Sequence, residues 1–165
     1  MSLRVRILGL DPGISRSGYG VVDYIGGQAK LVECGVIETK AKSQSGERLH
    51  TLYSGFREVI RKHKPELLAV EDSFLGKNFK SAKILGGAKA AALLAGAEYK
   101  LPSREYSPRE IKQAVVGKGA ASKAQVQFMV KNHLRLKQIP TPEDASDALA
   151  VALCCSFRLN SKGRK

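Results

Sequence analysis

One short stretch near the N-terminus decides the fold: Arg6-Ile7-Leu8-Gly9-Leu10-Asp11-Pro12-Gly13. Its apolar part, which extends back to Leu3, predicts a β-strand. The strand ends at Asp11, because Pro12 cannot donate to a sheet ladder and Gly13 tolerates the backbone of a tight turn. Asp11 is therefore expected at the edge of a sheet. An Asp-Pro-Gly triplet can be ordinary turn sequence, so a functional role for Asp11 depends on partners elsewhere in the chain.

Length and composition indicate one globular domain with an anionic partner. The 165 residues are 43% hydrophobic, and we expect a single domain over residues 1–158, followed by a basic, disordered tail over residues 159–165. Lys and Arg number 28 against 15 Asp and Glu, and the formal charge of +13 favours a polyanion such as nucleic acid. We find no apolar run of transmembrane length and no N-terminal signal pattern, so the sequence predicts a cytoplasmic protein with no membrane partner.

The cysteines and histidines do not indicate a disulfide framework or a zinc site. Cys154 and Cys155 are adjacent in a predicted helix and Cys34 lies in a predicted strand, so we expect three buried, reduced side chains. The three histidines are scattered over helices without ligand spacing.

The first half of the chain predicts a meander, a helix and a buried strand. Residues 19–25 and 29–37 are typical of strands, and Gly26-Gly27 between them is a hairpin signal. Apolar residues at three- and four-residue steps predict an amphipathic helix from Glu47 to about residue 64. The uniformly apolar run at residues 67–70 predicts a strand buried on both faces, and it ends at Glu71.

The second half predicts four helices and one short strand. Residues 81–97, rich in Ala, Gly and Leu, predict a helix that is either an ordinary buried helix or a subunit interface. A short strand at residues 103–106 precedes a helix that begins after Ser107 and is broken at Gly117-Lys118-Gly119. Two more helices are expected, over residues 123–134 and from Thr141 to about residue 157.

This order predicts an α/β domain with a mixed five-stranded sheet flanked by helices. The first three strands form an antiparallel meander and the two later strands run parallel. Strands 1 and 4 can be neighbours in such a sheet, which would place Asp11 and Glu71 a few ångströms apart at one edge.

Two further carboxylates lie three residues apart at the start of the last helix. Asp144 and Asp147 share one helix face near the positive end of the helix dipole. Asp144 can be simply part of the helix start, with Thr141 as N-cap. Asp147 borders an apolar segment, where an unpaired charge is costly and a bound cation would remove that cost. Oxygen ligands of this kind suit Mg²⁺, and two such ions can drive phosphodiester hydrolysis without a covalent nucleophile.

Cations and one aromatic residue fit a nucleic-acid substrate. Nine Lys or Arg and only two acids lie between Lys100 and Lys137, and phosphate contacts of this kind give affinity without base specificity. Phe74 lies in a polar segment three residues after Glu71. It is either a core residue or a stacking platform for an unpaired base.

Taken together, these residues resemble the RuvC family of Holliday junction resolvases, endonucleases of the RNase H-like superfamily. Each block is weak alone, but their order and spacing across nearly the whole chain are highly specific. The matching blocks are Gly9-Leu-Asp-Pro-Gly13 with Gly18-Tyr-Gly-Val21; Glu71 with Phe74 and Lys77-Asn78; Lys112-Gln113 with Val116-Gly117; Lys123 with Gln125-Val126 and Met129-Val130; and Asp144-Ala-Ser-Asp-Ala-Leu-Ala150.

The resemblance implies an RNase H-like nuclease that resolves four-way DNA junctions. Asp11, Glu71, Asp144 and Asp147 would form its catalytic and metal-binding centre, with two Mg²⁺ ions for which Mn²⁺ can substitute. A homodimer would cut two opposing strands symmetrically and leave 5′-phosphate and 3′-hydroxyl ends, and RuvA and RuvB would be its partners in branch migration. The candidate DNA-binding residues are Phe74, Lys77, Lys112, Lys118 and Lys123.

The chain departs from the family pattern in three places. Gly87-Ala88-Lys89-Ala90 stands where we expect Gln-Ala-Arg-Gly, which leaves the role of that arginine open. Asp72 adds an acid beside Glu71, where it is placed to change the metal preference, and Lys118 adds a cation to the glycine loop.

Two other interpretations compete with the nuclease. A strand followed by Asp-X-Gly also resembles the first phosphate loop of actin-like ATPases and sugar kinases, but we find no second phosphate loop and no adenosine-binding segment. The other is an inactive, structure-selective DNA-binding protein with the same fold, and the four intact carboxylates argue against it.

Overall fold

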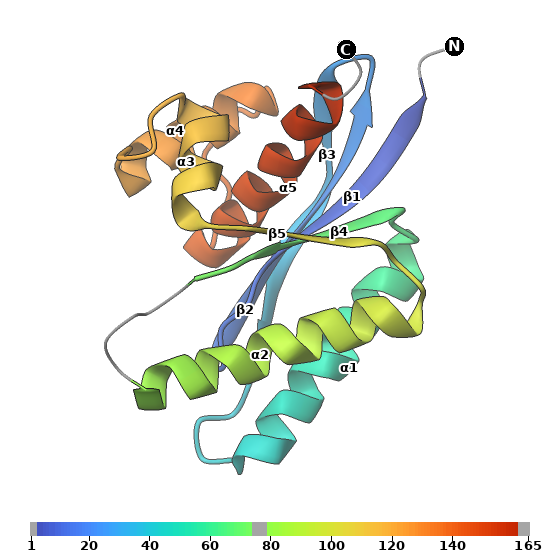
Figure 1. The fold of residues 1–165 in the computed structure, drawn as a ribbon, viewed down its shortest axis with the longest axis vertical. Helices are drawn as coiled ribbons and strands as arrows, with labels where there is room; N and C mark the ends of the chain where they lie inside the picture. The colour runs from blue at the N-terminus through green and yellow to red at the C-terminus, as the bar shows by residue number, and fades with distance from the viewer. Residues whose placement is uncertain (1–2, 74–78, 162–165) are drawn as a thin grey trace.

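The computed structural model describes residues 3–73 and 79–161, which form one mixed sheet with helices on both faces (Figure 1). The order across the sheet is β3-β2-β1-β4-β5. The first three strands pair antiparallel, whereas β4 runs parallel to β1 and β5 parallel to β4. The predicted meander with two parallel strands is confirmed. The strands are β1 (Arg4–Asp11), β2 (Arg16–Ile25), β3 (Gln28–Glu38), β4 (Leu67–Glu71) and β5 (Ser103–Tyr106).

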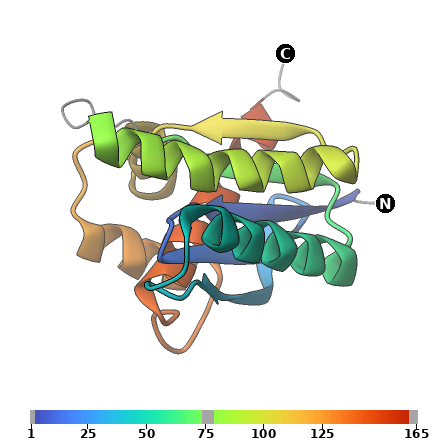
Figure 2. The same ribbon diagram turned by 90° about the horizontal axis from the view of Figure 1, so that it is seen from below.

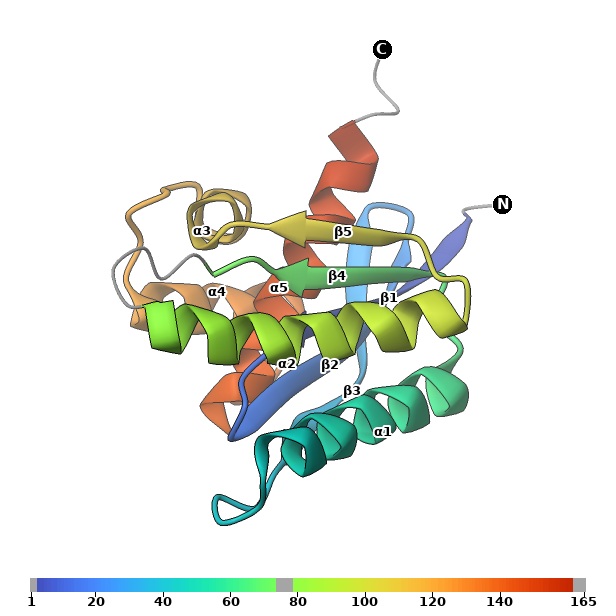
Figure 3. The same cartoon turned by 60° about the horizontal axis from the view of Figure 1, so that its bottom comes forward.

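Two helices, α1 (Ser45–His63) and α2 (Phe79–Glu98), lie side by side on one face of the sheet (Figures 2 and 3). The sheet residues beneath them include Leu8 of β1 and Leu68 of β4, which pack with Phe56 of α1 and Ala92 of α2. Side chains alternate between the two faces along a strand. The residues on either side of Leu8 and Leu68 therefore face the opposite side of the sheet.

Three helices cover that opposite face: α3 (Pro108–Val116), α4 (Lys123–His133) and α5 (Glu143–Ser161). Among them α5 lies directly on β1 and β2, because two glycines leave room for its backbone. A Cβ at Gly9 would collide with the carbonyl oxygen of Ala148, and a Cβ at Gly18 would collide with that of Asp144. This close contact fixes the first turns of α5 over the C-terminal end of β1.

The last helix differs from the sequence prediction at both ends. It begins at Glu143, and the carbonyl of Pro142, not a side chain of Thr141, accepts the first backbone hydrogen bond, from Ala145. The predicted N-cap role of Thr141 is therefore wrong. The helix also continues to Ser161, so residues 159–161 of the expected disordered tail are helical, and residues 162–165 lie outside the described part of the chain.

Two of the three cysteines are buried as the sequence predicts, and Cys34 is more exposed than expected. Cys154 and Cys155 are buried, Cys34 is half-buried, and all three thiols are free. Among the described helices we find none that is both long enough and apolar enough to cross a membrane.

Candidate active site

Asp11 and Glu71 are the last residues of two neighbouring parallel strands. Leu10 pairs with Val70 across β1 and β4, so the two acids leave the same edge of the sheet side by side. Both face the α5 side, because Gly9 and Ala69, two positions earlier, lie against the core formed with α5. The expected juxtaposition of the two strand ends is thus found in the structure.

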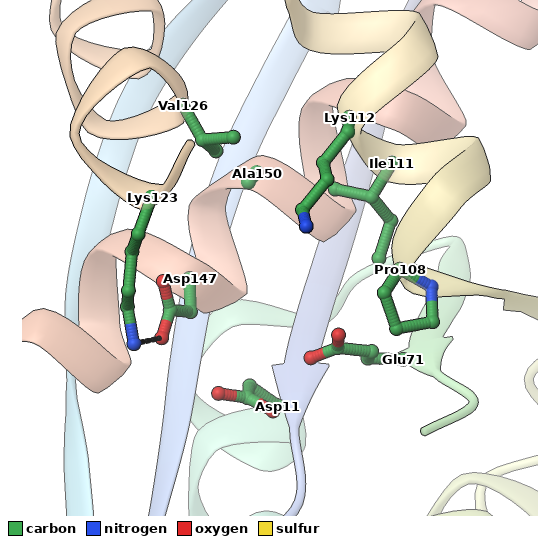
Figure 4. A pocket seen from close by; sticks show the side chains of 9 residues that line it. All are labelled: Asp11, Glu71, Pro108, Ile111, Lys112, Lys123, Val126, Asp147 and Ala150. Atoms are coloured by element: carbon green, nitrogen blue, oxygen red, sulfur yellow. Dashed lines mark ion pairs between the residues drawn. The ribbon is translucent and has the colours of Figure 1, made fainter. Parts of the chain in front are cut away.

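Asp147 of α5 completes a group of three acids around one cavity of about 350 Å³ (Figure 4). The acids project from β1, β4 and α5. Lys112 of α3 points into the cavity towards them, and Lys123 of α4 lies beside Asp147. Apolar side chains form the rest of the wall. They are Pro108, Ile111, Val126 and Ala150.

The acids repel one another where solvent is largely excluded. Burial is the main cause that raises the pKa of Asp11 to about 9, followed by a hydrogen bond to Glu71 and by the negative charges of Glu71, Asp147 and Asp144. Burial also raises the pKa of Asp147, against the opposing effect of Lys123. Burial and mutual repulsion both disfavour the ionised acids, and a bound cation would reduce that cost, so the site favours an added cation.

Lys123 is held at the rim by two carboxylates of α5. Its Nζ lies 3.1 Å from Asp147 and 3.2 Å from Glu143. The ammonium is about half exposed, so it can also reach a ligand that enters the cavity. The helix that carries it begins with a reciprocal capping box between Ser122 and Gln125, which fixes its first turn.

Lys112 is placed by the same kind of local structure on α3. The Ser107 hydroxyl accepts a hydrogen bond from the Glu110 backbone N–H, and the Glu110 carboxylate accepts one from the Ser107 backbone N–H, as the sequence predicts. One turn further on, Lys112 points into the cavity towards the acids (Figure 4). Two separate capped helices thus each present one ammonium group to the same space.

Asp144 stands apart from the other three acids. It does not line the cavity, and Arg16 at the start of β2 lies 3.5 Å from its carboxylate while also pairing with Glu38 at 2.8 Å. Its charge still contributes to the raised pKa of Asp11, so it is near the group. Within residues 3–73 and 79–161, we find no set of three or more His, Cys, Asp or Glu side chains already spaced to hold a metal ion.

Of the other predicted site residues, one lies away from the cavity and two lie outside the described part of the chain. Lys118 is exposed in the loop after α3 and does not line the cavity. Phe74 and Lys77 lie outside the described residues, so their predicted DNA contacts stay predictions. The sequence analysis did not identify Glu143 or Arg16 as neighbours of the site. Glu143 could have been found from its position one helical turn before Asp147, whereas Arg16 has no local sequence signal.

A family model and the sequences of known proteins both relate this chain to one family. The family model described as "Crossover junction endodeoxyribonuclease RuvC" matches residues 7–155. The protein of that name from Pelotomaculum thermopropionicum is 48% identical over 148 residues, which is 90% of this chain and 90% of the relative.

Solved structures show the same relationship. Thermus thermophilus RuvC superimposes with a TM-score of 0.88 at 34% identity, covering 96% of this chain and 97% of that one. The same protein in complex with Holliday junction substrate gives a TM-score of 0.91 at 35% identity, covering 96% of both chains. The RNase H-like fold expected from the sequence is thereby confirmed. With most of its length matched by the family model and by these relatives, the chain belongs to the RuvC family of crossover junction endodeoxyribonucleases.

Proposed function

We propose that this protein resolves four-way DNA junctions by hydrolysing phosphodiester bonds at the cavity between β1, β4 and α5. One observation carries the proposal: three acids from distant parts of the chain converge on a cavity that two lysines also line. A site that cleaves phosphodiester bonds needs acids that can bind metal ions and cations that can bind the phosphate, and both are present here. The matched relative solved with Holliday junction substrate points to the same DNA structure as the substrate here.

Nucleases of this family are metal-dependent, and the chemistry of the site fits a metal. All candidate ligands are carboxylate oxygens, which hard divalent cations prefer. Burial and the neighbouring acids raise the pKa of Asp11 to about 9, and a bound cation would oppose this shift by stabilising the ionised carboxylates. We infer that Asp11, Glu71 and Asp147 hold Mg²⁺, with Asp144 as the outer ligand, and that two ions bind and Mn²⁺ can substitute. Bound ions would activate a water and stabilise the leaving oxygen.

The protein's own side chains supply binding and orientation. Lys112 and Lys123 neutralise the phosphate that enters the cavity, and Asp147 and Glu143 keep the Lys123 ammonium at the entrance. The apolar wall formed by Pro108, Ile111 and Val126 limits the water that can reach the acids. Cleavage at this site would leave a 5′-phosphate and a 3′-hydroxyl end.

We further propose that two copies act together on one junction. α2 supports this proposal, because it is rich in Ala and Gly and still exposes Leu94 to 60%. A homodimer would place two active sites on opposing strands and so give symmetric cuts. Phe74, Lys77 and Lys118 stay candidates for further DNA contacts, and RuvA and RuvB are the expected branch-migration partners. Because its proposed substrate is DNA, we place the enzyme in the cytoplasm.

The test of this function compares a synthetic four-way junction with a linear duplex of the same sequence. With Mg²⁺ we expect paired, ligatable nicks in the junction only, and with chelator no cleavage. Asp11→Asn should abolish cleavage, a loss of at least about 10³-fold, because it removes a charged oxygen at the centre of the group, while junction binding is retained. Cleavage of both DNAs alike, or loss of binding together with cleavage in Asp11→Asn, would contradict the proposal.

A further inference from the structure

Lys89 of α2 forms an ion-pair cluster directly behind the active site. Its Nζ lies 2.7 Å from the Asp72 carboxylate and also pairs with the carboxylate of Glu105. Asp72 follows Glu71 at the end of β4, and Glu105 lies in β5 beside Val70. One ammonium group therefore joins α2 to the ends of two neighbouring strands.

Strand alternation explains why this cluster and the active site lie on opposite faces. Glu71 faces the cavity under α5, so Asp72 faces α2. The Asp72 backbone N–H also donates a hydrogen bond of 2.8 Å to the Tyr106 carbonyl, which continues the β4–β5 pairing one step beyond Glu71. The residue after Glu71 is thus held twice, by its backbone to β5 and by its side chain to Lys89.

We propose that Lys89 is a positioning residue, which fixes Glu71 by holding Asp72 and Glu105 from the far side of the sheet. The inference rests on the proposed function, since it assumes that Glu71 acts at the cavity. Lys89 itself does not line the cavity. Its effect on the reaction is therefore transmitted through the Glu71–Asp72 backbone.

The contacts favour orientation over stability as the role of Lys89. The side chains of Asp72 and Glu105 are 52% and 39% exposed and that of Lys89 is 24% exposed, and ion pairs with solvated carboxylates contribute little to the free energy of unfolding. The core of α2 is formed instead by apolar residues such as Ala88, Ala92 and Ala95. By contrast, a shift of about 1 Å in a catalytic group can cost about 100-fold in rate.

Asp72 explains why a cation is needed at this position. Two acids, Asp72 and Glu105, project towards the same side of the β4–β5 edge, and without Lys89 their charges would repel each other. If the two carboxylates moved apart, Asp72 would shift and would displace Glu71, the residue before it. A lysine or an arginine can each bridge the two carboxylates.

The experiment measures single-turnover cleavage of a four-way junction at saturating protein, together with junction affinity in chelator and the thermal midpoint. Lys89→Met keeps the apolar stem and removes the charge. We expect about a tenfold lower cleavage rate, junction affinity within about twofold of the original protein and a nearly unchanged thermal midpoint. Lys89→Arg should restore the rate. The matched control is Lys62→Met, which removes one cation and one ion pair, with Glu33, at the other edge of the sheet.

A second variant keeps the test valid if Lys89→Met does not fold. Glu105→Gln removes one partner of the cluster, leaves Lys89 in place and should by itself lower the cleavage rate. Where Lys89→Met also folds, the two rate losses should not add in the double variant. An unchanged rate in both single variants, a loss that Lys89→Arg fails to restore, or an equal loss in Lys62→Met would overturn the inference.

Glu71→Gln separates this inference from the function on which it rests. An inactive Glu71→Gln beside a fully active Lys89→Met contradicts only the positioning role. If Glu71→Gln still cleaves the junction, the proposed function at this cavity fails as well.

Discussion

Glu33 on β3 is a carboxylate whose ionisation stabilises the fold away from the active site. It accepts hydrogen bonds from Lys62 Nζ at 2.7 Å and from the Tyr19 hydroxyl at 3.0 Å, and His63 Nε2 lies 3.2 Å away. The hydrogen bond from Lys62 is the main cause that lowers the pKa of Glu33 to about 2. Because the folded protein holds the ionised form more strongly than the unfolded chain, this stabilisation is full above the ordinary glutamate pKa and is lost as the pH falls towards 2.

Glu33→Gln should remove this pH-dependent stabilisation. We expect the variant to be about 1 kcal/mol less stable near neutral pH, since the side chain is partly solvated, and the difference from the original protein to shrink as the pH drops below about 4.5. Urea unfolding at several pH values measures it. Glu58→Gln is the control, because Glu58 forms only an exposed pair with Arg61. A difference that does not change with pH would contradict the prediction.

Also at the scale of single residues, some site residues could be predicted from the sequence and others could not. Asp11 and Glu71 were predictable because each ends an apolar run, and an acid at that point must lie at a sheet edge. Asp144 could not be placed in the same way, because it pairs with Arg16, which comes from a strand far away in the chain. Side-chain pairs of this kind are decided by packing between elements and leave no local pattern.

At the scale of elements, hydrophobic periodicity and turn residues were sufficient for most of the fold. The hairpin glycines and the Ser107 capping box both have a local physical cause, and the structure has them where the sequence predicts them. The residues at which α5 begins and ends were predicted from local criteria, and both predictions were wrong. The helix is held by burial of every residue from Ala148 to Ser156, so tertiary contacts and not its ends determine its extent.

The contact between β1 and α5 gives a prediction for an element. Gly9→Ala would place a Cβ against the carbonyl of Ala148, next to Asp147, and α5 would have to move away from the strand. We expect a loss of about 1–3 kcal/mol in the free energy of unfolding and a larger fractional loss of junction cleavage than of binding. Gly46→Ala is the matched control, because a Cβ there has nothing within 4 Å. Unchanged stability in Gly9→Ala would show that α5 is not held as closely as described.

At the scale of the whole molecule, the charge of +13 contrasts with a cluster of acids inside one cavity. The excess of Lys and Arg gives general attraction for DNA, whereas the acids confine the reaction to one point. A basic composition indicates a polyanionic partner and says nothing of where cleavage occurs. That information comes from the two strand ends and the helix that meet at the cavity. The two lysines that line the cavity belong to the general positive charge and also lie next to the acids, so they can act both in DNA binding and in the reaction.

Substitution of Lys112 tests whether one lysine contributes both to DNA binding and to cleavage. As a phosphate contact, it should release about one counterion when DNA binds, so Lys112→Gln should make the dependence of log affinity on log salt less steep by about one unit. Because Lys112 also points at the acids, cleavage at saturating protein should fall by about tenfold. Lys30→Gln on β3, at the far edge of the sheet, serves as the matched loss of one charge and should alter neither the slope nor the rate. Junction affinity measured over a salt series, with cleavage rates on the same preparations, separates the two effects. A changed slope with an unchanged rate would make Lys112 a general DNA contact outside the reaction, and an unchanged slope would remove it from the interface altogether.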